Sequence, residues 1–236
     1  MTAPGAGIRG LLFDKDGTLF DFQRTWGAWA VEAIAALSAG DPALEARIAD
    51  ILGFDRAEGR FRKGSIVIAE TTPTIARHLA PVLPDAPDPG QLATRLDRIA
   101  LGTPQVPACD LGPLFARLAG AGLALGLATN DSAAAAEGHL STAGVRGAFG
   151  FVSGYDSGHG AKPGPGPARA FCAEAGLPPE AVAMVGDSLH DMECARAAGC
   201  VAIAVLTGPA EADTLGPASD AVLASIADLP HWLGLG

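Results

Sequence analysis

The sequence predicts an α/β fold: a doubly wound parallel sheet forming a Rossmann-like core, with an all-helical cap domain inserted into it. Three observations lead to this prediction. A short apolar segment near the N-terminus ends in acidic residues. From residue 111 onward, short apolar segments alternate with amphipathic ones, which is typical of parallel sheets covered by helices. The long stretch between these regions contains helical patterns and no clear strand.

The first predicted strand, residues 8–13, is a largely apolar run that ends in Asp14 and Asp16, after which Gly17 allows a sharp turn. In extended backbone, residues two apart point the same way. Ligands of open α/β sheets bind just beyond the carboxyl ends of the strands. Two carboxylates held close together repel one another unless a cation or a shared proton relieves them. The pair therefore predicts a metal site or a carboxyl group that acts as an acid, and the alternative is an Asp-Gly turn with solvated charges.

The predicted cap domain begins with an amphipathic helix at residues 23–38, in which Trp26, Trp29 and other apolar residues recur every three or four positions. We expect Phe22 and both tryptophans to pack within the cap or against the core rather than to contact substrate. Further helices are predicted at residues 43–52, 65–79 (interrupted at 71–73) and 89–101, and residues 54–64 are predicted to be irregular. The expected domains are a core of residues 1–21 plus 103–236 and a cap of residues 22–102.

The second half of the chain supplies the rest of the predicted sheet. Strands are predicted at residues 123–128, 149–152, 181–185, 201–205 and 221–223. Helices are predicted at residues 111–121, 132–143, 168–175, 191–198 and 226–233. Because apolar strands alternate with helices, the sheet should be parallel, with the N-terminal strand in a central position.

Composition limits the partners and the compartment. The chain of 236 residues is 49% apolar and carries a formal charge of −10, so a sizeable core can be buried, and nucleic acid or an anionic membrane is not an expected partner. No apolar run approaches the roughly 18 residues that a transmembrane helix needs. The four cysteines form no C-x-x-C pair, so we expect reduced thiols, a cytoplasmic protein and no zinc site. A monomer or a homodimer is expected.

Four polar motifs fall where strands are expected to end, or in a loop beyond one. Each motif by itself has an ordinary structural explanation: Thr129 could cap the next helix, Lys162 could be a solvated loop lysine, and Asp187 and Asp191 could be a helix cap and a surface charge. Their joint occurrence at corresponding positions of one fold argues against coincidence. The motifs are Asp14-x-Asp16-Gly17-Thr18, Thr129, Lys162, and Gly186-Asp187 with Asp191.

In order and spacing, these motifs resemble those of the haloacid dehalogenase-like hydrolase superfamily. Within it, the chain is most similar to the phosphoglycolate-phosphatase-like branch, which has a helical C1-type cap between the first and second motifs. The resemblance covers nearly the whole chain. It implies a phosphatase that depends on Mg²⁺ and forms an aspartyl phosphate. It also implies that the metal is held by Asp14, the backbone carbonyl of Asp16, and Asp187, with Asp191 supporting it directly or through water.

The chemistry of these residue types agrees with the resemblance. A carboxylate such as Asp14 can attack phosphorus and form an acyl phosphate. Asp16 can protonate the leaving oxygen and later accept a proton from water. Oxygen ligands and a phosphate substrate favour Mg²⁺. For phosphate binding, Thr129 offers a hydroxyl and an N–H group and Lys162 offers a positive charge, and the backbone N–H groups after Asp14 and Thr129, the latter that of Asn130, would complete the site.

One basic cluster, made of Arg60, Arg62 and Lys63, lies in the irregular segment of the predicted cap. Arginine side chains match carboxylates in geometry, so the cluster predicts recognition of a substrate carboxylate or a second anion. The alternative is a solvated loop. His190 is expected in a loop near the rim of the site. The other histidines lack the spacing of metal ligands and are expected to be structural or exposed: His78, His139, His159 and His231.

The leading functional hypothesis is a phosphatase acting on a small phosphorylated metabolite, with 2-phosphoglycolate as the first candidate. A haloacid dehalogenase is disfavoured, because the dehalogenases resemble this pattern without the second aspartate, Asp16. A sugar-phosphate mutase remains an alternative. So does a phosphonoacetaldehyde hydrolase, in which Lys63, the one lysine of the predicted cap, would form a Schiff base. A non-catalytic regulatory protein is the alternative of a different class, and the intact Asp14 and Asp16 argue against it.

Overall fold

The computed structural model describes residues 5–68 and 70–235. The chain forms two compact units, a sheet unit within residues 1–21 and 107–236 and a helical unit within residues 22–106. Residues 1–4 and 236 of the predicted core, and residue 69 of the predicted cap, lie outside the described residues. Among the helices that are described, none is both long and apolar enough to cross a membrane.

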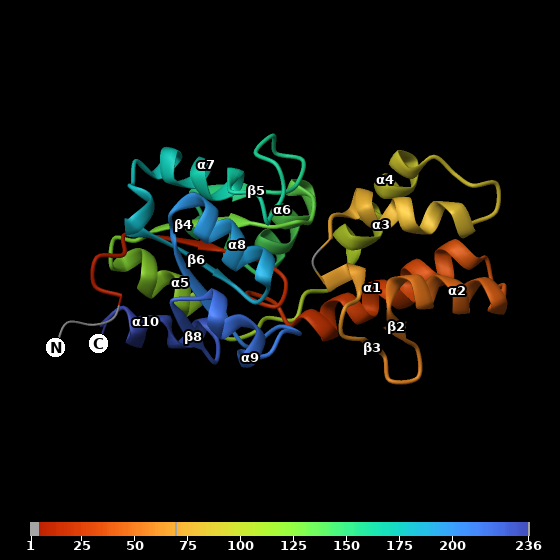
Figure 1. Cartoon of the computed structure of the whole chain (residues 1–236), viewed down its shortest axis with the longest axis horizontal. Coiled ribbons are helices and arrows are strands. Elements are labelled where there is room, and N and C mark those ends of the chain that lie inside the picture. Colours follow the sequence, from red (N-terminus) through yellow and green to blue (C-terminus); the bar gives the residue numbers. More distant parts are fainter. Residues whose placement is uncertain (1–4, 69, 236) are drawn as a thin grey trace. The chain divides into compact units, whose positions relative to one another are not determined.

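The sheet unit is built on six parallel strands in the order β5-β4-β1-β6-β7-β8 (Figure 1). β1, the first strand of the sequence, pairs with β4 on one side and with β6 on the other. The predicted parallel sheet with a central first strand is therefore confirmed, and the strand ends lie within two residues of those predicted. The strands are β1 (Gly10–Phe13), β4 (Ala124–Ala128), β5 (Phe151–Ser153), β6 (Val182–Gly186), β7 (Val201–Val205) and β8 (Ala221–Leu223).

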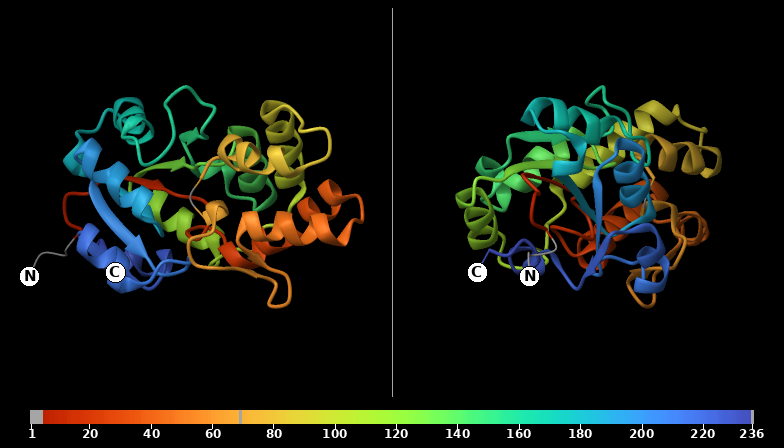
Figure 2. Two further views of the ribbon diagram at one scale, coloured as in Figure 1. Left: turned by 45° about the vertical axis from the view of Figure 1, so that its right-hand side comes forward. Right: turned by 60° about the vertical axis from the view of Figure 1, so that its left-hand side comes forward.

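Helices cover both faces of the sheet, because successive residues of a strand point to opposite faces and the buried strands are apolar on both. In β1, Leu11 and Phe13 belong to one hydrophobic core and Leu12 belongs to another. Figure 2 shows the sheet between its two helical layers, as predicted for a doubly wound fold. The first core is shared with α5 (Leu111–Gly120), α6 (Ala133–Thr142) and α10 (Leu229–Trp232), and the second with α7 (Gly166–Ala175), α8 (Leu189–Ala198) and α9 (Ala212–Leu215).

Aromatic side chains hold both layers against the strands. On the α5 side, the ring of Phe115 packs edge to face against those of Phe13 and Phe149, with centroid distances of 5.4 and 4.8 Å. On the α7 side, Phe171 lies so close to Gly126 of β4 that a Cβ atom at Gly126 would be 2.6 Å from the ring. The apolar residues predicted to form a core therefore pack in two layers, one on each side of β1.

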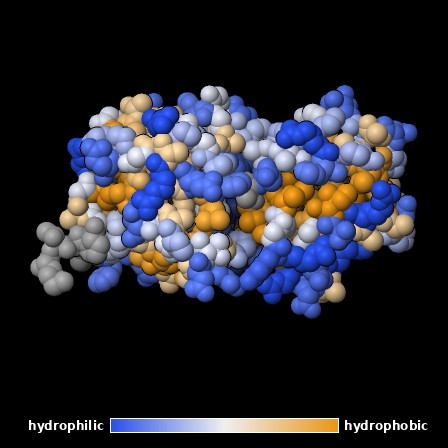
Figure 3. Space-filling model, in the orientation of Figure 1, coloured by the Kyte–Doolittle hydropathy of each residue, from blue (hydrophilic) through white to orange (hydrophobic). Residues whose placement is uncertain are grey.

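The helical unit has a hydrophobic core of its own. Trp29 and Ala33 of its first helix are buried in that core. The second helix begins at Asp41, whose side chain caps the first N–H groups, and ends at Gly53 in the left-handed conformation. Apolar side chains also gather among charged ones on the surface of this unit (Figure 3). The helices are α1 (Phe22–Ser38), α2 (Pro42–Leu52), α3 (Thr72–Leu79) and α4 (Pro89–Gly102).

The helical unit is not entirely helical, which corrects one part of the prediction. Residues 54–64, expected to be irregular, contain an antiparallel hairpin of β2 (Phe54–Asp55) and β3 (Arg60–Phe61). The Asp55 carboxylate accepts hydrogen bonds from the N–H groups of Ala57 and Glu58 and so stabilises the turn. Strands of two residues are too short to produce a detectable alternation in sequence. The helix expected at 65–79 is likewise divided, into a 3₁₀ turn at Ile66–Ile68 and α3.

We expect Phe115→Ala to destabilise the protein by about 3–5 kcal/mol, because the change leaves a cavity where the buried ring packs between two others. The midpoint of urea unfolding, followed by circular dichroism, measures the loss. Val222→Ala on edge strand β8, where the side chain is 38% exposed, is the matched control and should change the midpoint little. Equal midpoints for the two variants would contradict the packing described.

Candidate active site

The carboxyl ends of three adjacent strands bring the predicted motifs together. Asp14 follows β1, Thr129 follows β4 and Asp187 follows β6. Because β1 pairs in parallel with both other strands, these three positions are neighbours at one edge of the sheet. The N–H group of Asp14 extends the ladder by donating to the carbonyl of Val185 at 2.8 Å.

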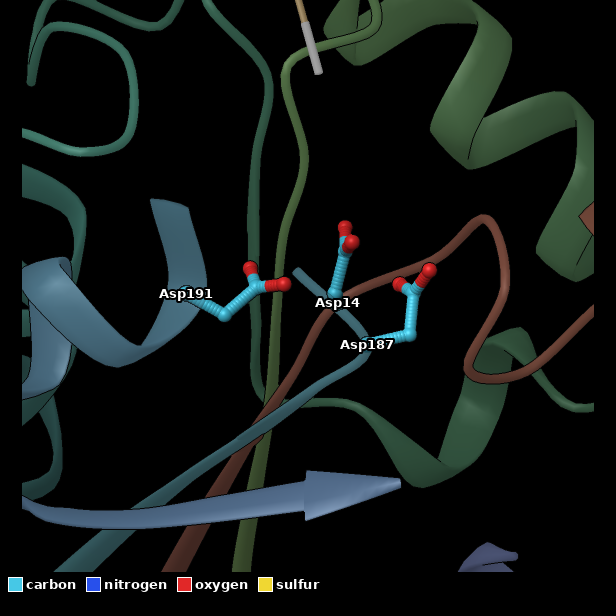
Figure 4. Close-up of side chains that lie close together, drawn as sticks. All are labelled: Asp14, Asp187 and Asp191. Atoms are coloured by element: carbon cyan, nitrogen blue, oxygen red, sulfur yellow. The ribbon is translucent and has the colours of Figure 1, made fainter. Parts of the chain in front are cut away.

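Three buried carboxylates, those of Asp14, Asp187 and Asp191, each have an oxygen within 4.8 Å of the other two. Figure 4 shows Asp14 and Asp187 at the ends of their strands and Asp191 reaching toward Asp14 from α8. Glycines permit this approach: a Cβ atom at Gly186 would overlap the Asp191 side chain, and one at Gly208 would overlap Asp187. Both aspartates are buried, so the alternative of a surface charge is wrong.

Lys162 is buried beside these carboxylates rather than solvated. Its ammonium lies 2.7 Å from Oδ1 of Asp14 and 2.6 Å from Oδ1 of Asp191. The side chain of Asn130 holds the backbone of Lys162 with two hydrogen bonds of 2.9 Å, one donated by its amide to the Lys162 carbonyl and one accepted from the Lys162 N–H. Asn130, predicted to bind phosphate, therefore uses its side chain to fix the position of Lys162.

The electrostatics of the site follow from burial and like charge. Burial, with repulsion from Asp191, raises the pKa of Asp14 to about 7 even though Lys162 partly offsets it. Burial, with repulsion from Asp14 and Asp191, raises the pKa of Asp187 well above its ordinary value. Burial by itself would lower the pKa of Lys162, but Asp14 and Asp191 raise it above its usual range. The site therefore contains more negative charge than its own lysine can balance.

Thr129 is positioned as predicted at a strand end, but only one of its two expected donors is available. Its N–H group donates to the carbonyl of Ser153 within the sheet, which leaves the hydroxyl. That hydroxyl accepts a hydrogen bond from the N–H group of Asp131 at 3.1 Å, so its own proton can still be donated. Helix α6 is capped by Ser132 and not by Thr129, which rules out the alternative of Thr129 as the helix cap.

Asp191 belongs both to the carboxylate cluster and to the capping box that starts α8. Its Oδ2 atom accepts hydrogen bonds from the N–H group and the hydroxyl of Ser188, at 3.0 and 2.7 Å, in a capping box at the start of α8. Its Oδ1 atom pairs with Lys162. Both carboxylate oxygens of Asp191 are therefore engaged within the protein.

The carboxylate of Asp16 points to a different partner, Lys15. The two oxygens of Asp16 lie 2.8 and 2.7 Å from the Lys15 ammonium, which is fully buried. Lys15 also approaches Oδ2 of Asp131 and Nδ1 of His139, each at 3.2 Å. Burial raises the pKa of Asp131 to about 6, less than it would without Lys15. Opposing the effect of burial, Asp16 and Asp131 raise the pKa of Lys15 above its usual range.

Lys15, Asp131 and His139 take part in this network, although the sequence motifs do not single them out. One signal could have found the first of them, since the chain has only three lysines, Lys15, Lys63 and Lys162. Two of these three are buried beside carboxylates. Lysine is rare in this chain, and Lys15 stands between two aspartates. This combination indicates an electrostatic role for Lys15.

The remaining predicted residues lie elsewhere. His190 belongs to the first turn of α8, not to a loop, because the capping box at Ser188 starts that helix earlier than expected. Arg60, Arg62 and Lys63 belong to the helical unit, whereas the other predicted site residues belong to the sheet unit. All three are exposed. The guanidinium of Arg62 pairs with Asp50 at 2.9 Å, a surface contact that is worth little and is readily exchanged.

The three clustered carboxylates fit a divalent cation. Asp187 forms no ion pair with a basic side chain among the residues that the structure describes, although it is buried and negatively charged neighbours surround it. Hard carboxylate oxygens in this arrangement suit Mg²⁺ or a similar ion. Asp14 and Asp187 could bind such an ion directly, and Asp191, whose oxygens are already engaged, could support it.

Carboxylates gathered beside a buried lysine, beyond the carboxyl ends of a parallel sheet, are the kind of site found in hydrolytic enzymes with an α/β fold. The chain belongs to the haloacid dehalogenase-like hydrolases, whose family model matches residues 8–199. Full-length relatives support the same assignment. A phosphoglycolate phosphatase of Shigella dysenteriae and one of Escherichia coli are each 31% identical, over 97% of this chain and 93% of the relative.

Other relatives cover less of the chain or are less similar in sequence. A phosphoglycolate phosphatase of Chromobacterium violaceum is 42% identical over 107 residues, 45% of this chain and 47% of that protein. The crystal structure of a predicted phosphoglycolate phosphatase from Haemophilus somnus matches with a TM-score of 0.75 at 19% identity, over 96% of this chain and 98% of that one. This structural match shows the fold alone. The expected family and enzyme class, a phosphatase of this family, are confirmed.

The raised pKa of Asp14 predicts how stability depends on pH without metal. Between about pH 4 and 7 the folded protein retains a proton on Asp14 that the unfolded chain has released. The stability that this proton contributes is present in full below about pH 4 and is lost as the pH rises to about 7. Because a cation competes with that proton, Mg²⁺ should raise the melting temperature more at about pH 8 than at about pH 5. Thermal unfolding of the wild type and of Asp14→Asn, each with chelator or with Mg²⁺, measures this.

Asp14→Asn provides the control, because an amide does not titrate in this pH range and so has no acidic proton for a cation to displace. Its melting temperature in chelator should fall less over the same pH range than that of the wild type. An equal stabilisation of the wild type by Mg²⁺ at both pH values would show that the Asp14 proton and the cation do not compete.

Proposed function

We propose that the protein is a Mg²⁺-dependent phosphatase that hydrolyses a small phosphorylated metabolite through an aspartyl phosphate at Asp14, with 2-phosphoglycolate as the first candidate substrate. The observation that carries the proposal is the environment of Asp14. This carboxylate lies beyond the central strand, beside the buried ammonium of Lys162 and within reach of Asp187. A nucleophilic carboxylate needs such a cationic partner to approach a phosphate, because both are negatively charged.

In the first step, Asp14 attacks phosphorus and the bond from phosphorus to the leaving oxygen breaks. Oδ1 of Asp14 accepts a hydrogen bond from the N–H group of Lys15 and lies 2.7 Å from the Lys162 ammonium. Oδ2 is the oxygen that would attack. Asp16 transfers a proton to the leaving oxygen, so the product leaves as an alcohol and Asp14 carries the phosphoryl group.

In the second step, water attacks the phosphorus of the aspartyl phosphate. Asp16, now a carboxylate, accepts a proton from that water, and the bond between phosphorus and Asp14 breaks. Inorganic phosphate is released and both aspartates return to their starting states. The same residue thus serves as acid and then as base, which covalent catalysis in two half-reactions allows.

The phosphoryl oxygens would be held by the Lys162 ammonium and the Thr129 hydroxyl, with Asn130 keeping Lys162 in position. When bound at Asp14 and Asp187, with the backbone carbonyl of Asp16 as a further ligand, Mg²⁺ would neutralise charge on the transferring phosphoryl group. Asp191 would support the metal indirectly, since its oxygens already bind Ser188 and Lys162.

The proposed substrate class rests on the relatives and on the basic cluster of the helical unit. Relatives of nearly full length are named phosphoglycolate phosphatases, and phosphoglycolate carries a carboxylate that Arg60, Arg62 or Lys63 could bind. A phosphonoacetaldehyde hydrolase is less well supported. A lysine that forms a Schiff base is usually activated by burial, whereas Lys63 is exposed. A sugar-phosphate mutase would return an isomerised sugar phosphate instead of inorganic phosphate, and product analysis separates the two.

We expect Asp14→Asn to abolish phosphate release while leaving the fold intact, because an amide cannot form the acyl phosphate. Asp16→Asn should slow alkyl phosphates by about 10²- to 10⁴-fold and p-nitrophenyl phosphate much less, because nitrophenolate leaves without a proton. Steady-state phosphate release and circular dichroism measure both. Substantial turnover by folded Asp14→Asn would contradict the mechanism, and equal losses on the two esters would remove Asp16 from the acid role.

The basic cluster predicts a specificity effect. Arg60→Gln, Arg62→Gln and Lys63→Gln, made one at a time, should include a variant that loses about ten- to a hundredfold in kcat/KM on phosphoglycolate, as expected for one charge-assisted contact. That variant should retain its activity on p-nitrophenyl phosphate, which has no carboxylate. Arg77→Gln, an exposed arginine on α3, is the matched control. Three variants that behave like this control would mean that the cluster is only solvated and does not bind the substrate.

A further inference from the structure

An ion pair with a buried lysine holds the carboxylate of Asp16. The side chain of Lys15 is fully buried, and its ammonium lies 2.8 Å from one oxygen of Asp16 and 2.7 Å from the other. Contacts to both oxygens restrict the direction of a carboxylate more than a contact to one does. Lys15 therefore constrains how Asp16 is aimed.

Lys15 is itself anchored from a different part of the chain. Its ammonium lies 3.2 Å from Oδ2 of Asp131 and 3.2 Å from Nδ1 of His139. A protonated lysine can only donate, so Nδ1 of His139 accepts and the ring proton is on Nε2. Asp16, Asp131 and His139 thus all place acceptor atoms near the buried ammonium, and such partners make burial of a lysine tolerable.

Helix α6 holds both anchors of Lys15. Asp131 lies immediately before the N-cap residue of α6, and His139 lies within the helix. Oδ1 of Asp131 accepts a hydrogen bond from the N–H group of Ser132, the N-cap residue of α6, at 2.7 Å. His139 is a buried residue of α6. The loop that carries Asp16 is therefore tied through Lys15 to a helix packed on the sheet.

The two buried lysines of the site have separate partners. Lys162 pairs with Asp14 and Asp191, whereas Lys15 pairs with Asp16 and Asp131. Lys162, and not the ammonium of Lys15, is therefore the cationic partner of Asp14. What Lys15 adds is a fixed direction for the second aspartate.

We propose that Lys15 is a positioning residue that aims the Asp16 carboxylate for proton transfer, with Asp131 and His139 as its anchors. The proposal rests on the proposed function, in which Asp16 protonates the leaving oxygen. If Lys15 only stabilised the fold, its loss would lower the turnover of every substrate by the same factor. If Lys15 positions Asp16, its loss should affect most the substrates whose leaving group needs a proton.

The test compares two substrates in Lys15→Met, which keeps an unbranched side chain of similar length and removes its charge. We expect kcat to fall at least about tenfold further on 2-phosphoglycolate, or on the alkyl phosphate that the wild type hydrolyses fastest, than on p-nitrophenyl phosphate. In an Asp16→Asn background, adding Lys15→Met should change that ratio less than about twofold, because the two residues act as one unit. Arg169→Met, an exposed cation on α7, should leave the ratio unchanged.

Equal losses on both substrates, or a full additional effect of Lys15→Met in the Asp16→Asn background, would overturn the proposal. If circular dichroism shows that Lys15→Met does not fold, Asp131→Asn decides, since its amide oxygen can still accept from Ser132. Asp131→Asn should shift the ratio in the same direction by at least about threefold, and an unchanged ratio would overturn the proposal. Activity of folded Asp14→Asn tests the proposed function separately, so the two failures can be told apart.

Discussion

Repulsion among carboxylates that are taken out of water is the constraint on which the rest of the site depends. The protein relieves most of it internally, because Lys15 and Lys162 between them contact four of the five. Asp187 is the exception, and its raised pKa reflects both its burial and its neighbours. A divalent cation would complete the balance at that position. The five carboxylates are those of Asp14, Asp16, Asp131, Asp187 and Asp191.

The sheet makes this concentration of charge possible. β1 is buried along its whole length, because its apolar residues belong to hydrophobic cores on both faces of the sheet. Its parallel neighbours β4 and β6 bring their carboxyl ends to either side of it. Stability thus comes from the interior of the sheet, where hydrophobic burial is large. The polar residues at its edge follow strands that are far apart in the chain, so they come together only when the sheet has formed.

Most of the fold could be predicted from the sequence, because strand alternation and helical periodicity are local signals. Asp14, Thr129, Lys162 and Asp187 could be found for the same reason, since each stands at or beyond the end of a recognisable strand. The pairing of Asn130 with the backbone of Lys162 could not be predicted, because it joins positions 32 residues apart through loop geometry. The hairpin at 54–61 was missed because its turn depends on one side chain, Asp55, and its strands are too short to show a period.

The insertion between β1 and β4 also affects how the chain can assemble during synthesis. β1 is translated first, yet its partners β4 and β6 begin only at residues 124 and 182. The helical unit, which lies within residues 22–106 and has its own core, precedes both partners in the chain. Because domains generally fold as units during synthesis, starting from the N-terminus, we expect this unit to fold before the sheet is complete. The apolar central strand cannot pair on both sides until β6 has been made, and unpaired strand edges favour aggregation.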